Sequence, residues 1–300
     1  MMDSEKIFLL FLIVFVSTSL LIVAGIVTSL IINSYQIFLR DGLSFIFKNV
    51  WNPVKEDYGI LPALLGTLIS SAIAISIAMP LAISLAIFSA EIAPTSIRGF
   101  INSVSDLMAS LPSVIYGLWG LYVLAPILNQ YIMTPLYQYL GFIPLFSTKP
   151  IPTNLFTAGV LLAIMITPFS SSIIREAYNA IPHHLKEAAY SLGMTRWEVI
   201  RTLLGYIKSA ILAGAFLALG RAMGETVAVA MVVGNTFTLP RSLFDMGYTI
   251  SSLIANQFPN AEAYSYMMPA LYGGALVLFM VGLIINLAGL YWIRRVMTRG

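Results

Sequence analysis

The chain has 300 residues, of which 59% are hydrophobic and only 10% are charged. A soluble domain has about 25% charged residues, so this chain has too few charges to coat a globule of its size. The composition therefore excludes a soluble enzyme, a nucleic-acid-binding domain and a disordered chain, and it indicates a polytopic membrane protein.

Cysteine is absent, and the two histidines, His183 and His184, are adjacent. A disulfide framework, a thiolate metal site and a cysteine nucleophile are therefore excluded. We expect neither a metal ion nor a catalytic residue in this chain.

Long stretches without charge mark the candidate membrane spans. Five of them contain no charged residue, and a sixth contains only Arg221 and Glu225. Each exceeds the ~20 residues that cross ~30 Å of hydrocarbon. We expect an all-α fold that forms a single membrane domain over residues 1–300. Its six transmembrane helices are predicted at residues 7–32, 64–89, 111–128, 156–174, 207–234 and 269–293.

The basic residues of the loops predict the orientation. If the N-terminus is cytoplasmic, ten basic residues lie inside, five lie outside and Arg221 lies in the membrane. The inside residues are Lys6, Arg98, Arg175, Lys186, Arg196, Arg201, Lys208, Arg294, Arg295 and Arg299, and the outside residues are Arg40, Lys48, Lys55, Lys149 and Arg241. We therefore expect a multi-pass protein of the cell membrane with both termini in the cytoplasm.

The cytoplasmic loop 175–206 carries the clearest local signals. Pro182 can end one helix and begin the next, and Gly193 is a natural C-terminal cap for a short helix. Thr195 and Glu198 have the spacing of a capping box, which opens a further helix. The loop is thus predicted to hold a short helix across the membrane face. This helix would expose Ala188 and Ala189 beside Glu187 for insertion into a partner's groove, or it would rest on the bilayer.

The segment from Glu187-Ala188-Ala189 to Gly193 resembles the EAA loop of ABC-importer inner-membrane permeases. That resemblance implies that Glu187, Ala188, Ala189 and Gly193 form a coupling helix, which docks on a cytoplasmic ATPase. No phosphate-loop sequence occurs in the chain, so ATP hydrolysis and the binding of ATP and Mg are expected on a separate subunit.

Arg221 and Glu225 are four residues apart in the fifth predicted span, so we expect them to share one helix face and to pair. A charge within the membrane must face the bundle interior or water. Arg221 would either line a solute path, where its planar donors match an oxyanion, or form a buried bridge that fixes helix register. Asn235, Ser113 and Tyr116 could bond a passing oxyanion or neighbouring helices.

The segment from Gly220 to Val229, followed by Gly234-Asn235, resembles phosphate-specific transport (Pst) permeases of the PstC type. Trp51-Asn52-Pro53 and the segment 111–120 are similar as well. The resemblance implies a type I ABC-importer permease fold and a translocation path that includes Arg221, Glu225, Thr226 and Asn235. It also implies a PstA-type second permease, a homodimeric cytoplasmic ATPase and an external phosphate-binding protein as partners, with inorganic phosphate as solute.

Several alternatives stay open from the sequence. The chain could pass another oxyanion, such as molybdate or sulfate. An ion-driven secondary anion transporter could use the same buried pair, although it would not need the loop from Glu187 to Gly193. A membrane sensor or scaffold is a third alternative. At the cytoplasmic end of the second span, Glu91 and Arg98 would either support the coupling helix or lie in solvent.

Overall fold

The computed structural model describes residues 4–297, with side chains from residue 8 to residue 295. The described chain is mostly helical. The helices are α1 (Ser4–Asp41), α2 (Ser44–Phe47), α3 (Leu61–Ile87), α4 (Thr95–Ser110), α5 (Ser113–Trp119), α6 (Ala125–Leu128), α7 (Thr134–Leu140), α8 (Leu155–Asn179), α9 (His183–Ser191), α10 (Arg196–Tyr206), α11 (Lys208–Gly224), α12 (Val227–Val232), α13 (Ile250–Gln257) and α14 (Met267–Met297). Strands β1 (Trp51–Asn52) and β2 (Asp57–Tyr58) form an antiparallel hairpin in which Trp51 faces Tyr58.

Shorter helical turns join these elements. Three are π-helical, Phe88–Ile92, Gly120–Leu124 and Asn129–Met133, and two are 3-10 turns, Pro144–Phe146 and Phe258–Ala263. The two later π-helical turns connect α5, α6 and α7 without an interruption. The segment from Ser113 to Leu140 is therefore one helical arm.

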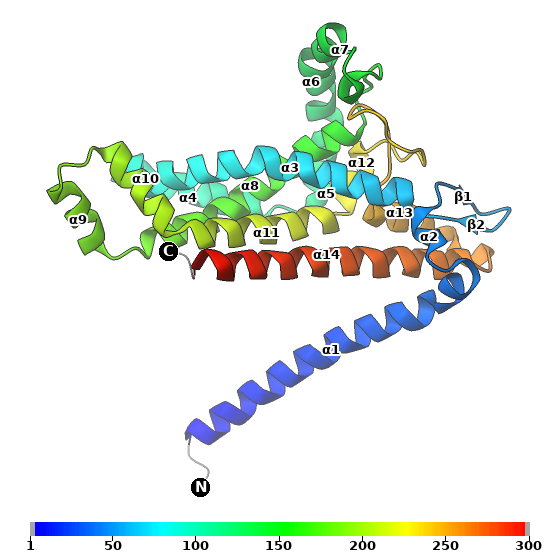
Figure 1. The fold of residues 1–300 in the computed structure, drawn as a ribbon, viewed down its shortest axis with the longest axis horizontal. Coiled ribbons are helices and arrows are strands. Elements are labelled where there is room, and N and C mark those ends of the chain that lie inside the picture. The colour runs from blue at the N-terminus through cyan, green and yellow to red at the C-terminus, as the bar shows by residue number, and fades with distance from the viewer. Residues whose placement is uncertain (1–3, 298–300) are drawn as a thin grey trace.

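The long helices α3, α8, α11 and α14 run side by side and form the body of the molecule (Figure 1). α9 and α10 lie at one end of this body, and the β1–β2 hairpin lies at the other. The arm from α5 to α7 projects from the flank, and α1 packs against α14 before it diverges from the body (Figure 1). The N-terminal end of α1 and the C-terminal end of α14 both point toward the end that carries α9 (Figure 1).

Small residues let α3 and α8 pack closely. Ala74, Ala78 and Ala82 of α3 are fully buried. On the α8 side, a Cβ added to Gly159 would lie 2.6 Å from the Cβ of Ile73. In a membrane the hydrophobic effect contributes little to helix association, because the lipid tails are themselves apolar. Van der Waals contact between closely packed helices holds them together instead.

Two predicted spans differ from the helices that the structure contains. The third predicted span, at residues 111–128, lies in the longer arm from Ser113 to Leu140, and this arm makes an angle of 94° with α4. Pro112 at the bend cannot donate a backbone hydrogen bond, which explains why α4 ends before it. The fifth predicted span, at residues 207–234, is not one helix, because α11 ends at Gly224 and α12 begins at Val227.

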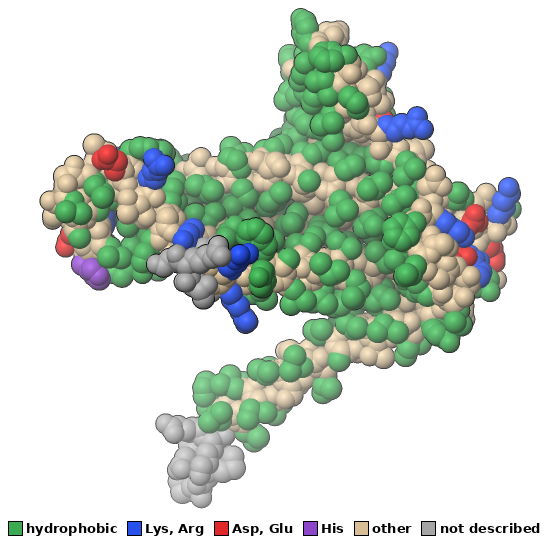
Figure 2. Space-filling view, viewed as in Figure 1, with side chains coloured by type: hydrophobic (Ala, Val, Ile, Leu, Met, Phe, Trp, Pro, Cys, Tyr) green, Lys and Arg blue, Asp and Glu red, His purple; other side chains and the backbone are tan. Residues whose placement is uncertain are grey.

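Length and composition make four of the described helices candidates for membrane spans. The number rises to six if each of two bent helix pairs counts as one span. On the face shown in Figure 2, charged side chains gather toward the α9–α10 end and toward the β1–β2 end, with a few on the arm. Hydrophobic side chains cover α1 and much of the flank between the ends (Figure 2). This distribution fits a membrane protein whose ends meet water.

Candidate functional site

The break between α11 and α12 is the central feature of the candidate path. Glu225 leaves the helix with an extended backbone (φ −67°, ψ 126°), and Thr226 precedes the first residue of α12. The hydroxyl of Ser251 in α13 donates to the backbone oxygen of Glu225 at 2.8 Å. A carbonyl that the broken helix leaves without its regular donor is thus satisfied by a neighbouring helix.

Arg221 lies in the last turn of α11, and its side chain is exposed. Its guanidinium carbon lies 5.4 Å from the centre of the Phe169 ring in α8, which is cation–π distance. Among the described residues, no ion pair includes Arg221. The cation is therefore held against an aromatic face, and its donor groups are free for another ligand.

The predicted pairing of Arg221 with Glu225 is wrong in this structure. Because α11 ends at Gly224, the helical geometry that would place the two side chains on one face does not reach Glu225. The carboxylate of Glu225 instead faces the first turn of α12, where it accepts from the backbone N–H of Ala228 at 3.4 Å. The Glu225 carboxylate thus caps the start of α12, and Arg221 has no carboxylate partner among the described residues.

Thr226 lines a hollow of about 370 Å³ beside the break. Its hydroxyl donates to the carbonyl of Gly224 at 3.2 Å. Ser251 contributes a second hydroxyl, and the remaining walls are small or apolar residues of α13 and α14: Ile254, Ala255, Ala275, Leu278 and Phe279. The hollow therefore offers a few polar groups in an apolar surrounding.

Asn235 lies beyond the C-terminal end of α12 in a left-handed conformation (φ 50°), next to Gly234 (φ 91°). Its side-chain amide donates to the carbonyl of Ala230 at 2.6 Å, which satisfies the end of α12. No hydrogen bond or ion pair joins the side chains of Arg221, Glu225, Thr226 and Asn235 within the part of the chain that the structure describes. These four residues flank α12 at its two ends.

The segment His183–Ser191 forms the predicted short helix, α9. Gly193 follows it with φ 77°, and its N–H donates to the carbonyl of Tyr190 at 2.9 Å. Glu187 and Ala188 are exposed, as expected. Ala189 is only 7% exposed because it packs with Ile181 and Val199, so the expectation that it is presented to a partner is wrong.

The predicted capping box opens α10. The Thr195 hydroxyl accepts from the N–H of Glu198, and the Glu198 carboxylate accepts from the N–H of Thr195 at 2.7 Å. The backbone N–H and the hydroxyl of Thr195 both donate to the Glu198 carboxylate, and these hydrogen bonds to its charged form hold the pKa of Glu198 below its usual range. The box stabilises the first turn of α10.

Two further contacts involve Phe169, which no sequence signal marks, and Glu91, for which two alternatives stood open. Phe169, which lies against Arg221, is 52 residues away along the chain, and nothing marks it among the other phenylalanines. Glu91 was left open between a support of the coupling helix and a solvated helix end. Its side chain is 6% exposed and accepts a hydrogen bond from Lys186 of α9, so it is a support.

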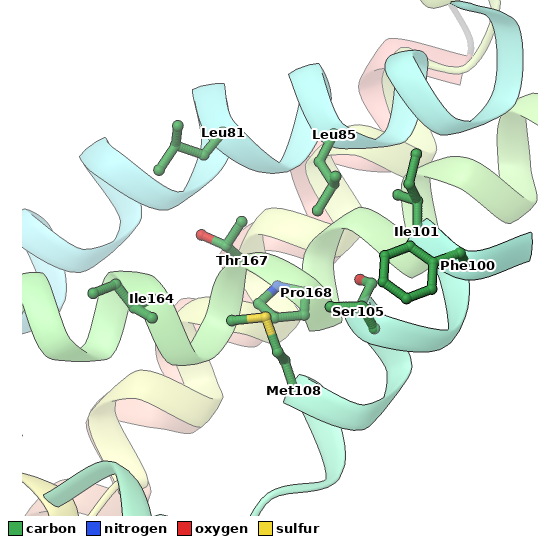
Figure 3. Close-up of a pocket in the computed structure, with 10 residues that line it drawn as sticks. Leu81, Leu85, Phe100, Ile101, Ser105, Met108, Ile164, Thr167 and Pro168 are labelled. Atoms are coloured by element: carbon green, nitrogen blue, oxygen red, sulfur yellow. The ribbon is translucent and has the colours of Figure 1, made fainter. Parts of the chain in front are cut away.

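A second hollow of about 330 Å³ lies between α3, α4 and α8. Leu81 and Leu85 of α3, Phe100, Ile101 and Met108 of α4, and Ile164 of α8 converge on it (Figure 3). The Ser105 hydroxyl beside it is buried and has no hydrogen-bond partner in the part of the chain that the structure describes. Its walls are apolar and none of the predicted path residues lines it, so an ion would not be stabilised there.

The chain matches the family described as binding-protein-dependent transport system inner membrane component over residues 78–298. It is 44% identical to the probable phosphate transport system permease protein PstC of Methanocaldococcus jannaschii over 268 residues, which are 88% of this chain and 85% of that one. It is 41% identical to the PstC of Pasteurella multocida over 266 residues, with 87% and 82% of the two chains covered.

Among solved structures, a bacterial alginate ABC transporter in complex with an alginate-bound periplasmic protein matches with a TM-score of 0.64 at 16% identity. The match covers 98% of this chain and 96% of that one. It shows the fold, which is that of an ABC-importer permease. The chain therefore belongs to the inner-membrane components of binding-protein-dependent transport systems, and within them to the PstC-type permeases.

Proposed function

We propose that this chain forms half of the translocation path of an ATP-driven importer of inorganic phosphate. The proposal rests on the environment of Arg221, which lies on an apolar helix. Its guanidinium packs over the ring of Phe169, and no carboxylate pairs with it among the described residues. The names of the relatives, which are phosphate transport permeases, support the choice of solute.

The chemistry of the guanidinium favours an oxyanion. Arg is always charged, and its planar fork of donors matches two oxygens of a phosphate at once. Placing such a charge in a membrane segment is costly, and function is the usual reason for it. Glu225 is turned to α12, so it does not compete with an anion for the donors of Arg221. Thr226 and Asn235 would provide hydroxyl and amide groups at either end of α12.

The importer needs further subunits, since the chain is the permease and carries no phosphate-loop sequence. We assign as partners a PstA-type second permease, a homodimeric cytoplasmic ATPase that binds ATP and Mg, and an external phosphate-binding protein. The exposed face of α9, with Glu187 and Ala188, is the surface that would dock on the ATPase. Both ends of the described chain point toward the α9 side, which supports cytoplasmic termini (Figure 1).

The test is phosphate uptake by the assembled complex in proteoliposomes that carry Arg221→Gln. Hydrogen bonds to charged groups contribute about 1.5–3 kcal/mol each. Loss of one of them predicts a fall in uptake of at least about tenfold, since 1.36 kcal/mol is a factor of ten. Lys208→Gln is the matched control, because Lys208 is an exposed cation at the other end of α11.

Uptake at the wild-type rate by Arg221→Gln would contradict the assignment of Arg221 to the path. Competition by sulfate or molybdate at concentrations that match phosphate would point to another oxyanion as the solute. Uptake by this chain without an ATPase, driven by an ion gradient, would favour a secondary transporter.

A further inference from the structure

Glu91 is a buried carboxylate at the end of α3 that faces α9. It belongs to the π-helical turn Phe88–Ile92, which continues α3. Its side chain is 6% exposed, and its Oε2 atom accepts from Lys186 Nζ at 2.5 Å and from the Tyr178 hydroxyl at 3.3 Å. A charge at this depth needs partners, and these two donors come from α9 and α8.

The backbone of the same residue makes a third link. Arg196, the first residue of α10, donates through its guanidinium to the backbone oxygen of Glu91. The π-helical turn ends at Ile92, and Ala93 continues in an extended conformation, so this carbonyl has no helical donor of its own. One residue of the turn that continues α3 thus binds α8, α9 and α10.

Apolar packing surrounds this polar junction. Ala86 and Ala90 of the α3 side form one buried cluster with Ile181, Ala189 and Val199 from the loop and from α9 and α10. Ala189, which is 7% exposed, belongs to the same cluster, so its side of α9 is covered within this chain. The exposed face of α9 is available to bind the ATPase, and Lys186 on this helix joins it to Glu91 at the end of α3.

From this geometry we infer that Glu91 is a positioning residue that transmits displacement of α9 to α3. The inference rests on the proposed docking of α9 on an ATPase. When α9 moves, the Lys186–Glu91 ion pair and the Arg196 bond draw the end of α3 with it, because separating the pair leaves the buried Glu91 carboxylate without its cation. α3 packs along α8, whose Phe169 supports Arg221, so the motion reaches the path.

The test uses the complete complex in proteoliposomes and compares Glu91→Gln and Lys186→Met with wild type. Three quantities are measured: the ATPase that co-purifies, the rate of ATP hydrolysis, and the phosphate taken up per ATP hydrolysed. Glu176→Gln is the matched control, because Glu176 is an exposed carboxylate of α8 at the same end.

We expect both variants to keep the bound ATPase and its hydrolysis within about twofold of wild type. Uptake per ATP should fall roughly tenfold, which lies within the range of coupling between distant sites. The double variant should be no worse than either single variant, since both remove the same link. The control should match wild type in all three quantities.

Unchanged uptake per ATP in Glu91→Gln and Lys186→Met would overturn the inference. A parallel decrease in the amount of chain, in the bound ATPase and in uptake in both variants would also overturn it, because the junction would then only stabilise the fold. If Glu91→Gln does not accumulate, Tyr178→Phe and Lys186→Met test the same junction, since Tyr178→Phe removes one hydrogen bond and no charge. An intermediate loss of uptake per ATP is expected for Tyr178→Phe, and a wild-type value would count against the junction.

Glu187→Lys separates this inference from the docking role on which it rests. Glu187 is exposed on α9 and takes no part in the junction. If Glu187→Lys leaves the ATPase bound and the transport intact, the docking role fails, whatever Glu91 does. If Glu187→Lys detaches the ATPase while Glu91→Gln transports as wild type, only the role of Glu91 fails.

Discussion

A double-mutant cycle on Arg221 and Glu225 distinguishes the helix break from a continuous helix. The variants are Arg221→Gln, Glu225→Gln and the two combined. On a continuous helix the side chains would form a buried ion pair, and removing one partner would destabilise the chain by about 3–5 kcal/mol. The combined variant would then regain part of that loss, because it leaves no unpaired charge.

The structure predicts smaller and additive effects. Arg221→Gln loses a cation–π contact of about 0.5–2 kcal/mol. Glu225→Gln keeps a side-chain oxygen for the N–H of Ala228, and that hydrogen bond is already long at 3.4 Å, so its loss would cost no more than about 0.5–1.5 kcal/mol. With no hydrogen bond or ion pair between the two side chains, the interaction energy should stay within about 0.5 kcal/mol.

Thermal unfolding of the purified complex measures the cycle. With about 2–4 °C per kcal/mol, additive behaviour gives a midpoint within ~2 °C of the sum of the single shifts. An ion pair would instead give single shifts of about 6–20 °C and a clear recovery in the double variant. That recovery would refute the break at Gly224 and Glu225 and restore the pairing expected from the sequence.

Two further predictions concern glycines. Gly66→Ala should destabilise the complex by about 1–3 kcal/mol, because the added Cβ would meet the backbone oxygen of Tyr248 at 2.1 Å. In α10, a Cβ added to Gly205 would meet nothing within 4 Å, so Gly205→Ala should stabilise the complex by up to ~1 kcal/mol. Equal thermal midpoints for Gly66→Ala and Gly205→Ala would contradict the close packing at Gly66. Gly193→Ala should loosen the end of α9 by about 1–2 kcal/mol through its left-handed backbone, with Gly193→Asn better tolerated. Amide hydrogen exchange of α9 measures this, and equal exchange in Gly193→Ala and wild type would exclude it.

Local signals made the loop 175–206 predictable. Pro182, Gly193 and the pair Thr195–Glu198 act through their own backbone or that of near neighbours, and the structure contains the α9 helix and the capping box that they predict. The long apolar stretches likewise identified the helices, because a membrane requires each spanning segment to satisfy its backbone internally. The motifs were specific enough to identify a PstC-type permease, which the relatives confirm.

The interruption of the fifth span could not be predicted from spacing. Gly224-Glu225-Thr226 contains no proline that would predict a helix end. The four-residue spacing of Arg221 and Glu225 therefore predicts one shared helix face. The break is stabilised from outside the segment, by Ser251 of α13, which donates to the Glu225 carbonyl 26 residues away. The burial of Ala189 likewise depends on residues outside the short helix, since its cluster includes Val199 of α10 and Ala86 and Ala90 at the end of α3.

The sequence by itself determined that the chain is a helical membrane protein, where most of its helices lie, and to which family of permeases it belongs. Hydropathy, caps and short motifs suffice for this, because each depends on residues that are close along the chain. Only the tertiary structure decided which charges have partners. Arg221 is left with an aromatic face and Glu91 is joined to α8, α9 and α10, because those pairings depend on helices that meet in space after long stretches of chain.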